Sequence, residues 1–175
     1  MGLPKPAERR LVHNRKIHCQ GYVREDGNFD IEAELIDSKT YNFPSDLHGT
    51  VHKDTPYHHM KVRITVDLDL KVTDASAVTI TGPYQICPRG AQNITNLIGL
   101  KIGPGWKRRV QTAIGGPSGC THITELTGPM ATTAYQAIGG ELSRQHREET
   151  TLNDFPETFQ ESKPKNNCIA FSQTR

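Results

Sequence analysis

The chain has 175 residues, a hydrophobic content of 34% and a formal net charge of +2, which is sufficient for one domain with a packed core. Its mean hydropathy of -0.60 indicates that part of the chain lies outside that core. The sequence has no basic block typical of nucleic-acid-binding proteins and no apolar run of about 18 residues typical of a membrane span. It also has no apolar core of a secretory signal near residue 1.

We therefore expect a cytoplasmic protein without a nucleic-acid or membrane partner. The four cysteines are far apart and form no Cys-x-x-Cys motif, so we expect reduced thiols.

The first predicted element after an irregular arm (residues 1–11) is a β-hairpin. Residues 15–24 and 29–35 alternate between apolar and polar, and Asp26-Gly27 lies between them, a sequence typical of a tight turn. One face is apolar and comprises Ile17, Cys19, Val23, Phe29, Ile31, Ala33 and Leu35. The other face carries Tyr22, Arg24 and several carboxylates, which form either exposed cross-strand pairs or a cleft where Tyr22 does acid–base work.

A long polar segment, residues 37–57, follows and reads as a loop of the length often found at functional sites. Residues 60–68 and 72–81 then predict a second hairpin. Three helices come next, with start signals at Pro88, Pro104 and Ser118 and stop signals at Gly99, Gly115 and Gly139. Pro129 should bend or break the third helix.

Strands before helices predict an α+β fold, an antiparallel sheet of hairpins followed by three helices. We place a single α+β domain at residues 12–140 and a polar tail at residues 141–175. Residues 168–171 could add one short strand to the tail.

The strongest candidate site is the segment 119–125, which contains a thiol, an imidazole and a carboxylate. Cys120 lies at a predicted helix N-terminus, where the positive end of the helix dipole lowers the pKa of a thiol and favours the thiolate. A thiolate can act as a nucleophile or as a metal ligand. His122 and Glu125 are three residues apart and lie on one helical face. They could act as an imidazole and its orienting carboxylate, or they could simply form a polar face exposed to solvent. Helical spacing directs Cys120 and His122 to different sides.

Further candidates come from the rest of the chain. Tyr22 and His58 join Cys120, His122 and Glu125 as candidate acid–base or nucleophilic groups. The candidate substrate-binding residues, chosen for anionic or aromatic ligands, are His13, Arg15, Arg24, His59 and Trp106. The alternative for Trp106 is core packing.

Several short motifs together resemble an uncharacterised bacterial family, a domain of unknown function. They are the segments 9–13, 21–22, 26–32, 102–106 and 119–126. His59 stands where members of that family tend to have an acidic residue, so this position departs from the pattern.

Residues 57–138 are also similar to the iron–sulfur cluster scaffold proteins of the NifU-like fold. The resemblance implies a NifU- or SufE-like core and a ligand set of His58 (or His59), Cys87 and Cys120. A histidine replaces the first scaffold cysteine and Gly119 replaces a scaffold histidine, so a standard cluster site is not intact. A His-Cys-Cys set suits a zinc ion with an open fourth position, which His122 could close.

Three hypotheses about function remain. The first is a lyase or hydrolase that uses His, Cys and Glu side chains on a small organic substrate, for which we consider aromatic compounds of bacterial catabolism. The second is a zinc, iron or iron–sulfur binding protein of the scaffold type. The third is a binding module without chemistry. A half-exposed sheet is compatible with a homodimer in each case.

Overall fold

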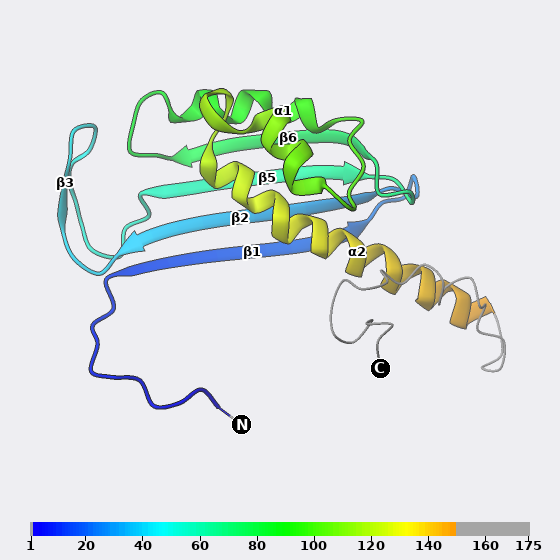
Figure 1. The fold of residues 1–175 in the computed structure, drawn as a ribbon, viewed down its shortest axis with the longest axis horizontal. Helices are drawn as coiled ribbons and strands as arrows, with labels where there is room; N and C mark the ends of the chain where they lie inside the picture. Colours follow the sequence, from blue (N-terminus) through cyan, green and yellow to red (C-terminus); the bar gives the residue numbers. More distant parts are fainter. Residues whose placement is uncertain (1, 150–175) are drawn as a thin grey trace. The chain divides into compact units, whose positions relative to one another are not determined.

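The structure, a computed structural model, describes residues 2–149. Four strands form one antiparallel sheet in the order β1-β2-β5-β6 (Figure 1). Their bounds are β1 His13–Val23, β2 Phe29–Lys39, β5 His58–Val66 and β6 Val72–Thr81. Both predicted hairpins are confirmed, although the strands β1, β2 and β5 begin or end a few residues outside the predicted limits.

A small second hairpin lies within the segment that the sequence predicts as a loop. Its strands are β3 Phe43–Ser45 and β4 Gly49–Val51, which pair antiparallel. Short polar strands of this kind carry little hydrophobic periodicity, so the sequence pattern does not distinguish them from loop.

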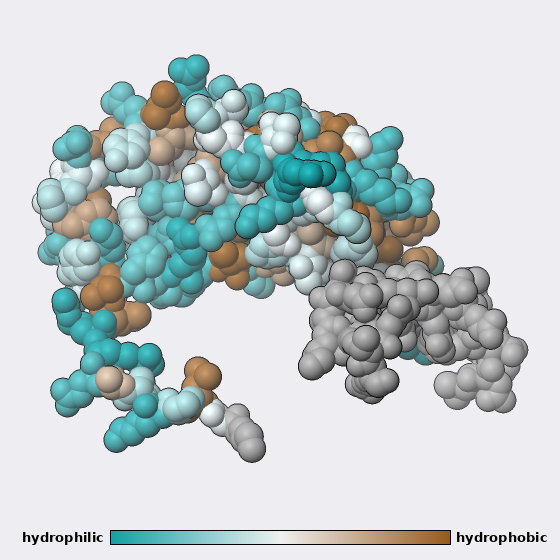
Figure 2. All heavy atoms as spheres, viewed as in Figure 1, coloured by the Kyte–Doolittle hydropathy of each residue, from teal (hydrophilic) through white to brown (hydrophobic). Residues whose placement is uncertain are grey.

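Helices follow the sheet, as the α+β prediction requires. They are η1 Cys87–Leu97, α1 Trp106–Ile114, η2 Gly116–Ser118 and α2 Thr121–Glu149. The first predicted helix is therefore present but has 3-10 geometry. The helix α2 crosses one face of the sheet (Figure 1), and the outward sides of the helices are mostly hydrophilic (Figure 2).

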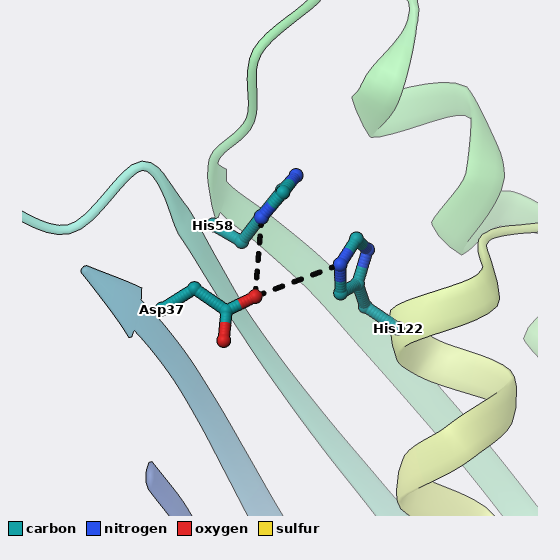
Figure 3. Close-up of side chains that lie close together, drawn as sticks. All are labelled: Asp37, His58 and His122. Atoms are coloured by element: carbon teal, nitrogen blue, oxygen red, sulfur yellow. Dashed lines mark hydrogen bonds and ion pairs between the residues drawn. The ribbon is translucent and has the colours of Figure 1, made fainter. Parts of the chain in front are cut away.

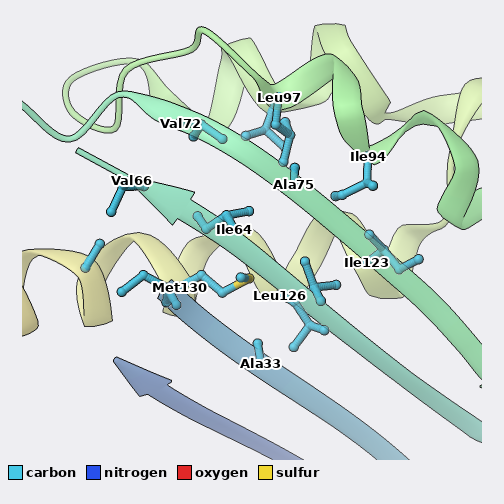
Figure 4. Close-up of a cluster of buried hydrophobic side chains, with 14 of the residues drawn as sticks. Ala33, Ile64, Val66, Val72, Ala75, Ile94, Leu97, Ile123, Leu126 and Met130 are labelled. Carbon is cyan, nitrogen blue, oxygen red and sulfur yellow. The ribbon is translucent and has the colours of Figure 1, made fainter. Parts of the chain in front are cut away.

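The hydrophobic core lies between that face of the sheet and the helices (Figure 4). Inward-facing strand residues such as Ile31, Leu35 and Ile64 are fully buried, as are Leu126 and Met130 of α2. Full burial of side chains of this size contributes about 1.5–3 kcal/mol each. This packing fixes α2 across the strands and so determines which polar residues the helix brings to the sheet.

Pro129 does not break α2. Proline cannot donate the hydrogen bond to the carbonyl of Glu125, four residues earlier. Pro129 is exposed while Leu126 and Met130 on the core side are buried, so water can satisfy that carbonyl. Core packing therefore outweighs the missing hydrogen bond.

The helix α2 also continues through Gly139 and ends at Glu149, beyond the predicted boundary. Contacts within the chain group residues 1–138 into one compact unit and later residues into a second. In the second unit Arg144 and Glu141 form an ion pair at 2.6 Å. The strand suggested for residues 168–171 lies outside the described residues.

In the part of the chain that the structure covers, no helix combines the length and the apolar character needed to span a membrane.

Gly21 in β1 permits the close approach of α2. A Cβ at this position would lie 2.7 Å from Cβ of Ala137, so Gly21→Ala should displace the helix and lower the free energy of unfolding by about 1–3 kcal/mol. Urea denaturation measures the change. Gly128→Ala is the control, because a Cβ there meets nothing within 4 Å; equal losses in both variants would contradict the proposed clash.

Candidate functional site

The core-facing row of β2 ends in a buried carboxylate. Phe29, Ile31, Ala33 and Leu35 occupy alternate positions of this row, and Asp37, the next position, has an exposed fraction of 0%. The sheet register places Arg15 of β1 and His58 of β5 directly beside Asp37. One end of the core-facing side of the sheet is therefore ionic instead of apolar.

Asp37 accepts most of the polar contacts at this end of the sheet. Arg15 donates from Nε to Oδ1 and from Nη2 to Oδ2, each at 2.8 Å. His13 Nε2 lies 3.2 Å from Oδ1, and His58 Nδ1 lies 3.1 Å from Oδ2. His122 of α2 completes the set, with Nε2 3.6 Å from Oδ2 (Figure 3). We call His13, Arg15, Asp37, His58 and His122 the Asp37 cluster.

The Arg15 guanidinium keeps Asp37 ionised. Burial alone raises the pKa of this carboxyl, but the hydrogen bonds and charge of Arg15, with smaller contributions from the neighbouring imidazoles, outweigh burial and hold the pKa below its ordinary value. An ionised carboxylate only accepts hydrogen bonds. The imidazole nitrogens that face it therefore carry protons.

His58 consequently has a free basic nitrogen. Its Nδ1–H donates to Asp37, which leaves the lone pair on Nε2. Burial lowers the pKa of His58, the charge of His122 lowers it further, and Asp37 opposes these effects only in part. A neutral, oriented imidazole can act as a general base or as a metal ligand.

Cys120 lies beside His122, with Sγ 3.8 Å from Nδ1. The expectation that these two side chains diverge was wrong, because Cys120 precedes Thr121, the first residue of α2, and is not subject to helical spacing. Burial raises the pKa of the Cys120 thiol, but hydrogen bonds from His122 and from the backbone N–H groups of Ile123 and His122 lower it below its ordinary value. The thiolate is thus favoured at the start of the helix.

Glu125 has a different partner from the one that its spacing suggests. Its Oε2 accepts a hydrogen bond from Arg15 Nη1 at 2.6 Å. The carboxylate beside His122 is Asp37, which the sequence analysis did not select. Arg15 therefore bridges Asp37 of the sheet and Glu125 of α2, and its role here is to position these carboxylates.

The proposed His58, Cys87 and Cys120 ligand set does not meet. Among the described residues, the group of three or more potential ligands whose atoms lie within 4.8 Å of one another is Asp37, His58 and His122. Cys87 and Cys120 instead line a separate cavity of about 460 Å³ between η1 and the start of α2.

The remaining candidates lie elsewhere. Arg24 pairs with Asp26 and Asp30 at the turn of the first hairpin, and Tyr22 is on the uncovered face. His59, on that face too, contacts Glu34 at 2.6 Å. That face has a hollow of about 330 Å³ whose lining includes Glu32, Glu34, Lys61 and Arg63, but Tyr22 does not line it. Trp106 is a core residue, and its Nε1 donates to Thr127 O at 3.0 Å.

A comparison with protein-family models matches residues 13–136 to a family described as "Protein of unknown function (DUF2889)". This range contains the whole Asp37 cluster and Cys120. No curated protein and no solved structure matches the chain, and these comparisons give no support to the NifU-like resemblance.

Proposed function

The chain belongs to the DUF2889 family of unknown function, and from its site we propose that it is a small thiol-dependent enzyme of the hydrolase or lyase type. The observation that carries the proposal is the series of contacts from Cys120 Sγ to His122 Nδ1 (3.8 Å) and from His122 Nε2 to Asp37 Oδ2 (3.6 Å). A nucleophile, a base and an orienting carboxylate in this order form the arrangement used for covalent catalysis.

Each group has a role in the proposed reaction. His122 accepts the proton of the Cys120 thiol at Nδ1, while the charge of Asp37, 3.6 Å from Nε2, stabilises the imidazolium that forms. The thiolate then attacks an electrophilic carbon, such as an ester or thioester carbonyl, and His122 returns the proton to the leaving group.

Two further features suit the hydrolysis of the covalent intermediate and the binding of a substrate. The free Nε2 of His58 can remove a proton from the water that hydrolyses the covalent intermediate. The cavity of about 460 Å³ that Cys120 lines has room for a small organic substrate. We propose a substrate of this size with an activated carbonyl.

Mass spectrometry after incubation with p-nitrophenyl acetate tests the proposal. We expect transient attachment of one acetyl group to Cys120 and none to Cys19, whose pKa is raised by burial. Acetylation that persists in Cys120→Ser, or that falls on another cysteine at an equal rate, would rule out the nucleophile.

A second candidate function is binding of a divalent metal ion by Asp37, His58 and His122. Asp37 Oδ2 lies 3.1 Å from His58 Nδ1 and 3.6 Å from His122 Nε2. Donor atoms about 2.1 Å from one tetrahedral zinc ion are roughly 3.4 Å apart, which these two distances approach. The ligand atoms of all three side chains lie within 4.8 Å of one another. The bidentate contact of Arg15 with Asp37 opposes it, because a cation already neutralises the carboxylate.

Calorimetric titration with Zn²⁺ distinguishes the two functions. If the metal site is real, His58→Ala should weaken binding by about 100-fold or more, since even the loss of an outer partner of a ligand costs about 10–100-fold. His59→Ala on the uncovered face is the matched control and should bind as the wild type does. Binding lost in Cys120→Ser, or absent from the wild type, would contradict this site.

A further inference from the structure

We propose that Cys87 and Cys120 form a reversible dithiol site that reacts with hydroperoxides and closes to an internal disulfide. Both cysteines are free, partly buried and line the same cavity of about 460 Å³. The inference uses Cys120 but does not require it to be a catalytic nucleophile.

The packing of Gly90 against Cys120 indicates that Cys120 lies close to the helix that carries Cys87. A Cβ at Gly90 would lie 2.8 Å from Cβ of Cys120, so Cys120 occupies the space that a side chain at position 90 would take. Residues three apart in a 3-10 helix are eclipsed, with a rise of about 2.0 Å per residue. Cys87 is therefore on the same side of η1 as Gly90, roughly 6 Å along the helix axis.

The helix η1 can supply the movement that a disulfide needs. A bridge requires Cβ atoms about 3.5–4.5 Å apart. The helix η1 runs for 11 residues in 3-10 geometry and has no side-chain hydrogen bond at its N-cap. Runs of this type longer than about four residues are uncommon because their hydrogen bonds are poorly aligned, so we expect the first turn, which holds Cys87, to rearrange more easily than a turn of α-helix would.

The reaction balances with a hydroperoxide as the oxidant. The Cys120 thiolate attacks one peroxide oxygen, the O–O bond breaks, and the leaving oxygen takes a proton from solvent, giving a sulfenic acid and an alcohol or water. The Cys87 sulfur then attacks the Cys120 sulfur. An S–S bond forms, the S–O bond breaks, and water leaves with the proton of the Cys87 thiol.

Peptide mapping of the full chain after treatment with hydrogen peroxide tests this proposal. We expect a Cys87–Cys120 bridge, the loss of two hydrogens per chain and full reversal by dithiothreitol. In Cys87→Ser the bridge should be lost completely, and dimedone should instead trap a sulfenic acid on Cys120. Cys19→Ser is the matched control and should keep the bridge.

Two results would overturn the proposal. One is oxidation of Cys120 in the wild type to sulfinic or sulfonic acid without a bridge to Cys87. The other is a bridge that joins Cys120 to Cys19 or Cys168. Neither result depends on acetyl transfer by Cys120, so failure here is distinct from failure of the proposed enzymatic function.

Discussion

Replacement of His122 by alanine should slow the acylation of Cys120 by about 10²- to 10⁴-fold, the range that a positioned acid–base group contributes. The variant loses the imidazole whose Nδ1 is 3.8 Å from Cys120 Sγ. It also loses the imidazolium that Asp37 would stabilise beside the thiolate. The rate of p-nitrophenol release, followed together with the acetylated fraction of the protein, measures the effect.

A matched histidine controls for a general effect of the substitution. His59 is on the other face of the sheet and contacts Glu34, so His59→Ala should acylate at the wild-type rate. Circular dichroism should show that both variants keep the fold. If His122→Ala reacts within a factor of about two of the wild type, the proton transfer assigned to His122 is wrong.

Replacement of Asp37 by asparagine should lower the free energy of unfolding by about 3 kcal/mol at pH 7. The amide cannot match the bidentate charge contact with Arg15 and leaves positive groups unpaired at a buried position. We place the loss at the lower end of the usual range because the Arg15 side chain is 32% exposed and water screens part of the interaction. Urea denaturation gives the value.

Glu125→Gln is the control, because Glu125 contacts the same arginine from an exposed position. The Glu125 side chain is 48% exposed, so its loss should cost about 1 kcal/mol or less. Equal losses for the two variants would contradict the central place of Asp37.

The stability difference between the wild type and Asp37→Asn should depend on pH with a defined sign. The pKa of Asp37 is lower in the folded chain than its ordinary value. Its contribution to stability is therefore complete above the unfolded value, about 3.9, and is lost as pH falls through the folded value. The stability difference between wild type and Asp37→Asn should therefore shrink as pH falls below about 4.

The fold could be predicted from the sequence to a large extent because its periodicities are strong. Asp26-Gly27 between two alternating segments determines the first hairpin, and Trp106, Val110 and Ile114 mark the buried side of α1. The exceptions have local causes. Core packing carries α2 past Pro129, and hydrophobic spacing does not separate the 3-10 helix η1 from an α-helix.

The site was predicted only in part, because its central residue belongs to another segment. Cys120 and His122 were both candidates, although their side chains were expected to diverge, and the carboxylate beside His122 is Asp37 and not Glu125. The signal for Asp37 was present. The apolar alternation that ends at Leu35 continues by one step to Asp37, so an aspartate occupies a core-facing position. A buried carboxylate requires partners, and a search for cations on adjacent strands would have found Arg15.

The Asp37 cluster draws its members from β1, β2, β5 and α2, and this dispersal affects when the growing chain can assemble it. Synthesis from the N-terminus produces the three strands before α2, so the growing chain carries Asp37 and His58 before Cys120 and His122 exist. The imidazole and the helix terminus that lower the pKa of the thiol become effective only when α2 packs on the sheet. The lowered pKa of the Cys120 thiol is therefore a property of the completed fold, and newly made or partly unfolded chains lack it.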